Sequence, residues 1–242
     1  MKTRTEQIAQ TLACVAFAVS VWVGMTYQAE AQAPIRDDDH RFRQYVWSYK
    51  ALKEQNVVLQ KYDFSCGAAS LATVLQYFWG DYVTEKEILQ EMVAQMSVVE
   101  LKDRMENGLT MTDLRRVAVK LGYEAAIGTL EYDKLEESKV PLIVGISPKG
   151  FDHFVVYRGT DGFYVYLADP VRGNIRIPGY EFAQQWQKNM VLAVAKPGDD
   201  DPPSFTPLTV TADEWLLGRM NEQHIRRIPS QHLRPLPYYT LP

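Results

Sequence analysis

Residues 57–80 read VVLQKYDFSCGAASLATVLQYFWG, and this stretch decides the fold that we expect. It opens with a short β-prone run, and the loop 61–65 follows. From Cys66 onward, apolar residues recur at the 3.6-residue spacing of a helix, at positions 68, 69, 71, 72, 75 and 78. Gly80 is a natural stop for such a helix. The stretch therefore predicts a strand, a loop and a long apolar helix that begins at Cys66.

The segments on either side of this helix extend the pattern. One further helix is expected near Thr84, where Thr84 to Glu87 fits a capping box, and another over Thr112–Leu121. The second half of the chain contains β-prone runs at 141–146, 153–158, 163–167 and 190–195. Helices followed by strands are typical of an α+β domain in which N-terminal helices pack on an antiparallel sheet.

The N-terminus reads as an export signal. A basic start is followed by an apolar run over Leu12–Met25 and by small-x-small patterns at 29–31 and 31–33. We expect cleavage after Ala31, because the other site would put Pro34 directly behind the scissile bond. The protein is then periplasmic or secreted. An uncleaved anchor is the alternative, although the run is shorter than the ~20 residues that a spanning helix needs.

The composition of the whole chain is that of an ordinary globular protein, with 242 residues, 46% hydrophobic and 23% charged. A formal net charge of −4, without a Lys/Arg cluster, excludes a nucleic-acid partner bound through bulk charge, and membrane contact is expected only through the signal or anchor. The expected parts are a signal peptide over 1–31, a lead-in over 32–56, a folded domain over 57–196, and a linker and tail over 197–242.

Removal of the signal leaves Cys66 as the only cysteine, because Cys14 lies in the apolar run. A single thiol in an exported protein calls for an explanation. A helix N-terminus favours a thiolate through its unpaired N–H groups and its dipole, so Cys66 is a candidate nucleophile. Ser65 is the expected N-cap, and Gly67 would leave room for a substrate carbonyl. The alternative is an inert buried cysteine.

A thiolate nucleophile needs a base, and His153 alone of the four histidines falls inside the expected core. Asp169 ends the next strand, where an antiparallel neighbour would bring it level with His153 to hold the imidazole. Asp152 should point to the opposite face, because successive strand residues alternate. The alternatives are a histidine satisfied by a backbone carbonyl and an aspartate that serves the turn before Pro170.

The remaining requirement is an oxyanion hole. The backbone N–H of Cys66 and the side-chain amide of Gln60, six residues upstream, could supply it. Such a site needs no cofactor and no metal. A metal site made of Cys66, His153 and Asp169 is a weak alternative, since three ligands of mixed type lack paired cysteine spacing.

Gln60 and the run DFSCGAASLA over 63–72 resemble the active-site helix of the bacteriocin-processing, double-glycine leader peptidases, which are papain-like cysteine peptidases. The resemblance covers about residues 57–195 and continues in family order through Gly108-Leu109-Thr110, the 114–122 helix, 141–144, 153–156 and Asp169-Pro170. It implies a papain-like fold, with Gln60 as oxyanion donor, Cys66 as nucleophile, His153 as base and Asp169 as the residue that orients the base.

Two features depart from the transporter-linked members of that family. Ser65 stands where those members often carry an acidic residue, which puts their substrate preference in doubt for this chain. The export signal, with no expected transporter domains, instead resembles stand-alone exported members, some of them encoded beside functional-amyloid secretion systems. An amyloid-forming partner is a candidate that this resemblance raises and that no residue by itself indicates.

The expected function is that of an exported cysteine endopeptidase. It would hydrolyse a peptide bond in a secreted or surface-destined polypeptide through a Cys66 thioester, with cleavage after a Gly-Gly-type motif as the candidate specificity. A non-catalytic module of peptidase fold that binds or escorts exported polypeptides is one alternative. A cell-wall peptide hydrolase is the other.

The signal reading predicts the start of the mature protein. After export from a Gram-negative host, N-terminal sequencing should begin at Gln32, because Ala31 supplies the small residue that signal peptidase requires before the cut. The substitution Ala31→Arg should block this cleavage. A purified chain that retains Leu12–Met25 would instead show the uncleaved anchor.

Overall fold

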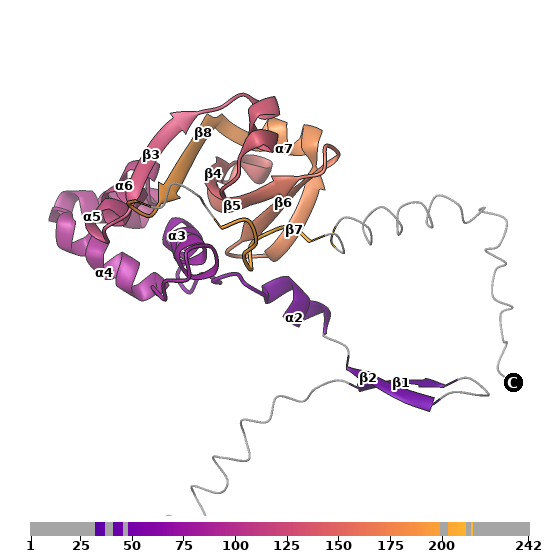
Figure 1. Ribbon diagram of the computed structural model, residues 1–242. Coiled ribbons are helices and arrows are strands. Elements are labelled where there is room, and N and C mark those ends of the chain that lie inside the picture. Colours follow the sequence, from indigo (N-terminus) through magenta and orange to yellow (C-terminus); the bar gives the residue numbers. More distant parts are fainter. Residues whose placement is uncertain (1–31, 37–40, 46–47, 199–202, 212–213, 215–242) are drawn as a thin grey trace, which may run out of the picture. The chain divides into compact units, whose positions relative to one another are not determined.

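A computed structural model of the protein describes residues 32–36, 41–45, 48–198, 203–211 and 214 (Figure 1). The signal predicted over 1–31 and the end of the tail over 215–242 lie outside the described residues. The chain divides into two compact units after Ala51. In the first unit, β1 (Gln32–Arg36) and β2 (Arg41–Tyr45) pair antiparallel, and α2 (Tyr49–Glu54) crosses the division.

The second unit begins its globular part with helices. The helix predicted from residues 57–80 is confirmed as α3, but the short strand predicted before it is wrong: residues 57–60 join no sheet, because the N–H groups of Val58 and Gln60 bond to Oγ1 of Thr73 and the carbonyl of Pro170. Three shorter helices follow α3, and the bounds are α3 (Cys66–Tyr77), α4 (Glu85–Gln95), α5 (Val98–Asn107) and α6 (Met111–Lys120). The capping box predicted at Thr84 is present, and boxes at Ser97 and Thr110 begin the next two helices. None of the helices in the described ranges combines the length and hydrophobicity that crossing a bilayer requires.

The sheet of this unit has six strands in the order β3-β8-β4-β5-β6-β7, and every neighbouring pair is antiparallel. Their bounds are β3 (Glu124–Thr129), β4 (Leu142–Ile146), β5 (His153–Thr160), β6 (Tyr164–Asp169), β7 (Gly173–Pro178) and β8 (Trp186–Ala195). The last strand lies between β3 and β4, so the chain ends its sheet at an internal position beside the edge strand β3 (Figure 1).

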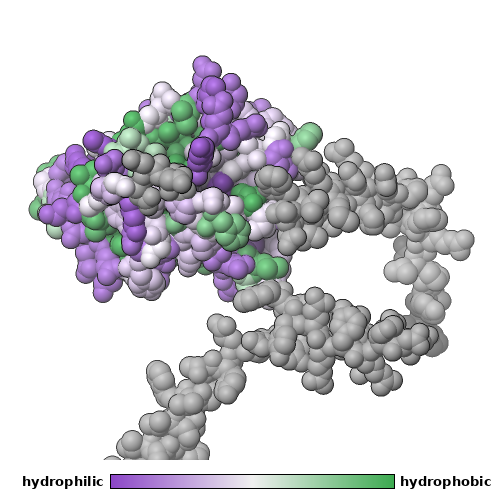
Figure 2. All heavy atoms as spheres, viewed as in Figure 1, coloured by the Kyte–Doolittle hydropathy of each residue, from purple (hydrophilic) through white to green (hydrophobic). Residues whose placement is uncertain are grey.

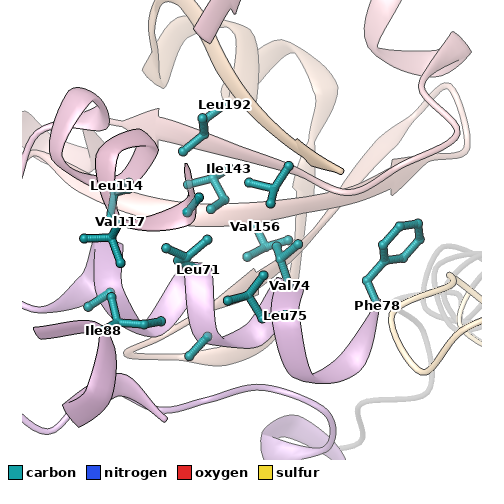
Figure 3. Close-up of a cluster of buried hydrophobic side chains, with 14 of the residues drawn as sticks. Leu71, Val74, Leu75, Phe78, Ile88, Leu114, Val117, Ile143, Val156 and Leu192 are labelled. Atoms are coloured by element: carbon teal, nitrogen blue, oxygen red, sulfur yellow. The ribbon is translucent and has the colours of Figure 1, made fainter. Parts of the chain in front are cut away.

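The helices α3 and α6 pack on one face of the sheet, and α4 packs on these two helices. Leu71 and Leu75 of α3 and Leu114 of α6 share a buried cluster with Ile143 of β4 and Val156 of β5 (Figure 3). A second cluster covers the opposite face, where α7 (Gly179–Gln185) contributes a fully buried phenylalanine. Strands buried on both faces are apolar at successive positions, which explains the unbroken run that predicted β4. The expected α+β, papain-like arrangement of helices on an antiparallel sheet is confirmed.

The outer surface of this unit is mixed in character. In Figure 2, hydrophilic residues cover much of the described face, with smaller hydrophobic areas between them. Among the exposed apolar side chains are Val98, Val99 and Met105 of α5, a helix that has no buried residue.

A segment beyond β8 joins the same core. Leu208 is 2% exposed and belongs to the cluster that α3 forms with the sheet. Its carbonyl accepts a hydrogen bond of 2.9 Å from Nε of Arg158, and the carbonyl of Pro207 accepts one of 3.1 Å from Nδ2 of Asn56. Residues 203–211 are therefore packed against the domain that the sequence placed over 57–196.

The burial of Leu208 predicts a structural role for this segment. Leu208→Ala should lower the free energy of unfolding by about 2–5 kcal/mol, because it removes apolar contacts and leaves a cavity. Phe205→Ala is the matched control: this residue is 76% exposed, so the change in the free energy of unfolding should stay within about 0.5 kcal/mol. Urea denaturation of the two variants measures both values. Equal stability of the two variants would show that the segment does not contribute to the core.

Candidate active site

Cys66 is the first residue of α3, and its side chain is partly exposed as a free thiol. Ser65 occupies the N-cap position, but its hydroxyl makes no cap bond to the helix. The hydroxyl lies instead 2.8 Å from the carbonyl oxygen of Tyr62 and in hydrogen-bond contact with Oε1 of Glu85. Ser65 is therefore the N-cap residue, as predicted, but the first turn of α3 carries no side-chain cap.

His153 and Asp169 meet across neighbouring strands. His153 is the first residue of β5 and Asp169 the last of β6, and the register that pairs Val156 with Ala168 places them close together. Nε2 of His153 lies 3.0 Å from Oδ1 of Asp169, and both side chains are buried. This leaves Nδ1 as the ring nitrogen that can face Cys66, whose side chain contributes to the raised pKa of the imidazole.

Asp169 serves the turn and the histidine at once. Its Oδ1 accepts hydrogen bonds from the backbone N–H groups of Val171 (2.8 Å) and Arg172 (3.0 Å), the pattern of an Asx turn. Its Oδ2 accepts from Nε of Arg172 at 2.6 Å. The two sequence readings of Asp169, as a turn residue and as the partner of His153, are therefore compatible. The contact with Arg172 was not predicted, although an i,i+3 spacing of opposite charges is a visible signal.

The pairing of His153 with Asp169 strongly shifts the pKa of both side chains. Burial by itself would lower the pKa of His153, but the hydrogen bonds to Asp169 and Cys66 and the charge of Asp169 outweigh it and raise that pKa to about 9. Burial would raise the pKa of Asp169, yet the contact with His153 and the backbone N–H groups hold it well below its usual range. At neutral pH the imidazole is protonated and the carboxylate ionised.

Gln60 lies in the loop that leads to Cys66. Its backbone N–H donates to the carbonyl of Pro170 at 2.9 Å, which fixes Gln60 next to the end of β6. One N–H of its side-chain amide donates to the carbonyl of Tyr62 at 2.9 Å, so the second N–H of Nε2 is the one available to a ligand. Oε1 of Gln60 is buried and has no partner among the described residues.

Gly67 has a packing reason that the sequence did not reveal. A Cβ at this position would lie 3.1 Å from Cδ2 of Leu114 and 3.2 Å from Cδ2 of Phe154. The missing side chain therefore lets the start of α3 approach α6 and β5 closely. The reading of Gly67 as space for a substrate carbonyl is not needed to explain its presence.

Asp152 is occupied elsewhere, as strand alternation predicts. Its Oδ1 accepts from Oγ of Ser147 at 3.0 Å and from Nε2 of Gln187. It forms no hydrogen bond or ion pair with the imidazole of its neighbour His153. Within the described ranges, no group of three His, Cys, Asp or Glu side chains is arranged to hold a metal ion.

Comparisons with known proteins show which family the sequence resembles. The model of the Peptidase C39 family matches residues 54–198. The chain is 35% identical over 162 residues to the "Probable functional amyloid protease FapD" of Pseudomonas aeruginosa, covering 67% of this chain and 70% of that relative. It is 36% identical over 171 residues to the protein of the same description from Pseudomonas fluorescens, covering 68% and 73%. A crystal structure of a double glycine motif protease from an AMS/PCAT transporter, in complex with the leader peptide, shares 28% identity with a TM-score of 0.49, covering 60% of this chain and 93% of that one.

The raised pKa of His153 predicts how stability depends on pH. The protonated imidazole stabilises the folded state fully below its unfolded pKa of about 6.5, and this stabilisation is lost as pH rises through about 9. The free energy of unfolding should therefore fall between pH 6.5 and 9 by an amount on the order of a few kcal/mol. In Asp169→Asn, which lacks the charge that raises the pKa, this fall should largely disappear.

Asp152→Asn is the control for this experiment, because Asp152 does not contact the imidazole. Urea denaturation at several pH values measures all three proteins. A wild-type curve that stays flat over this window, or that is matched by Asp169→Asn, would contradict the assigned ion pair.

Proposed function

The chain belongs to the peptidase C39 family and is a cysteine peptidase, and we propose that Cys66, His153, Asp169 and Gln60 are its catalytic residues. The observation that carries the proposal is the ion pair between His153 and Asp169, held beside Cys66 at an uncapped helix N-terminus. These features are the ones that a thiolate nucleophile requires.

In this mechanism, each residue has one task. The Cys66 sulfur attacks the scissile carbonyl carbon, a C–S bond forms, and the π electrons of the carbonyl move to its oxygen. The backbone N–H of Cys66 and the second amide N–H of Gln60 donate to that oxyanion. Asp169 keeps the imidazolium of His153 oriented through Nε2.

Collapse of this first intermediate breaks the C–N bond. His153 gives its proton to the departing amine, which leaves a thioester on Cys66. The neutral imidazole then takes a proton from water, and the resulting hydroxide attacks the thioester. A second oxyanion forms in the same hole, and its collapse releases the carboxylic acid and restores the thiolate and the imidazolium.

The substrate that we propose is an exported polypeptide. The two Pseudomonas relatives are described as probable functional amyloid proteases, which supports an amyloid-forming protein as the substrate of this chain. The resemblance of the segment around Cys66 to double-glycine peptidases supports cleavage after a Gly-Gly-type motif. Action outside the cytoplasm follows from the N-terminal signal pattern.

The mechanism predicts a graded loss of peptidase activity. Cys66→Ala should abolish cleavage and leave folding intact, since it removes only the sulfur atom of a small, partly exposed side chain, and His153→Ala should have a comparable effect. Asp169→Asn should retain measurable activity, because the nucleophile and the base remain. Mass spectrometry of a Gly-Gly-containing peptide and of its Ala-Ala counterpart measures cleavage, and purified cell wall is the competing substrate.

Asp152→Asn is the control and should cleave as the wild type does. Cleavage that persists in Cys66→Ala would refute the mechanism. Solubilised wall fragments without peptide cleavage would show a wall hydrolase, and a wild-type thiol no more reactive toward a peptidyl electrophile than free cysteine would show a binding module.

A further inference from the structure

Glu85 is a buried carboxylate that the catalytic residues leave unused. It is the first residue of α4, and it is 4% exposed. A carboxylate at such a depth is costly unless hydrogen bonds satisfy it. Its Oε1 accepts one bond of 3.0 Å from the backbone N–H of Lys61 and another from the hydroxyl of Ser65.

These two donors stand at the ends of the active-site loop. Lys61 directly follows Gln60, and Ser65 directly precedes Cys66. One carboxylate oxygen therefore joins the residue after the oxyanion donor to the residue before the nucleophile. The distance between Gln60 and Cys66 is restrained by a group on a different helix.

Tyr62, inside the loop, links the restrained Ser65 to the side-chain amide of Gln60. The carbonyl of Tyr62 accepts hydrogen bonds from the backbone N–H of Ser65 at 3.2 Å and from Nε2 of Gln60 at 2.9 Å. The direction of the remaining amide N–H of Gln60 thus depends on where Tyr62 lies. Tyr62 in turn is held through Ser65, which Glu85 holds.

Glu85 also affects the helix that carries Cys66. A serine at the N-cap ordinarily accepts a hydrogen bond from an N–H group of the first turn. The hydroxyl of Ser65 is instead turned toward Tyr62 and Glu85, and α3 has no side-chain cap. The positive end of α3 is left to the thiolate and the oxyanion.

Helix capping does not account for this glutamate. Thr84 and Glu87 already form the complete capping box of α4, with both reciprocal bonds present. An acidic residue in the first turn interacts favourably with the helix dipole whatever the direction of its side chain. The burial of Glu85 and its bonds to Lys61 and Ser65 are additional to that effect.

We infer, on the basis of the mechanism proposed above, that Glu85 is a positioning residue that sets the geometry of the oxyanion hole. It acts through Lys61 and Ser65 and touches no reacting atom. Its removal should impair the step that forms an oxyanion. A reaction of Cys66 that forms no oxyanion should proceed nearly as before.

Two assays on the full chain separate these effects. The first measures kcat and KM for hydrolysis of the peptide that the wild type cleaves, a reaction that passes through an oxyanion. The second measures alkylation of Cys66 by iodoacetamide at neutral pH, a direct displacement at carbon that needs only the thiolate.

Glu85→Ala should lower kcat about 100-fold, the scale of a lost oxyanion-hole donor, while KM and the alkylation rate stay within about threefold. Glu85→Gln keeps the size of the side chain and one acceptor oxygen, so it should restore most of kcat. Glu87→Ala is the matched control on the same helix turn. It removes the capping box, and kcat should be unchanged.

Ser65→Ala gives an independent reading if Glu85→Ala does not fold. It removes the hydroxyl that Glu85 holds at little cost in volume, and kcat should fall about tenfold at constant KM and alkylation rate. Wild-type kcat in Ser65→Ala and in every folded Glu85 variant would overturn the inference. Alkylation that falls in parallel with kcat would overturn it too, because Glu85 would then only support the fold around Cys66. Failure of the mechanism itself is separately visible as cleavage by Cys66→Ala.

Discussion

The packing of α3 on β5 is the contact on which the rest of the site depends. Leu71, Val74 and Leu75 bury one face of this helix against Val156 and the neighbouring strands (Figure 3). Gly67 allows the first turn to come close, because a Cβ there would lie only 3.1 Å from a side chain of α6 and 3.2 Å from one of β5. As a result, the first turn of α3 lies against the start of β5, and Cys66 faces His153.

The ion pair of His153 and Asp169 is stable only because the folded domain supplies further partners for its buried charges. Burying two charges is unfavourable unless each is paired and hydrogen-bonded, and removal of one partner from such a pair typically costs about 3–5 kcal/mol. Asp169 meets this condition through His153, Arg172 and two backbone N–H groups. The antiparallel register of β5 and β6 supplies the first of these contacts, and the turn after β6 supplies the others.

Stability and chemistry place opposite demands on the helix termini. The helices α4, α5 and α6 each begin with a complete capping box, which satisfies their first N–H groups. The helix α3 has a serine in the same position and no side-chain cap. The helix left open is the one that carries the proposed nucleophile, and the hydroxyl of its serine is turned toward a buried carboxylate on the neighbouring helix.

Much of this could be read from local patterns in the chain. The 3.6-residue spacing after Cys66 predicted α3, and the apolar run at 141–146 predicted β4, because burial on one helix face or on both faces of a strand leaves a periodic trace. The elements β3, β7 and α5 were not predicted from the sequence. Their sequences, EAAIGT, GNIRIP and VVELKDRMEN, are half-exposed and contain glycine, proline or many charges, so packing and pairing decide their structure.

The sequence by itself determined which residues were candidates for chemistry: one cysteine at a helix start, one histidine in the core, and an aspartate and a glutamine at suitable places. Tertiary structure alone decided their partners. A hydrogen bond depends on the distance and direction between two groups, which composition and periodicity do not give. Neither the hydrogen bond of Ser65 to Glu85 nor that of Arg172 to Asp169 could therefore be predicted. The same holds for Leu208, whose burial depends on the surface that the folded sheet and helices present to it.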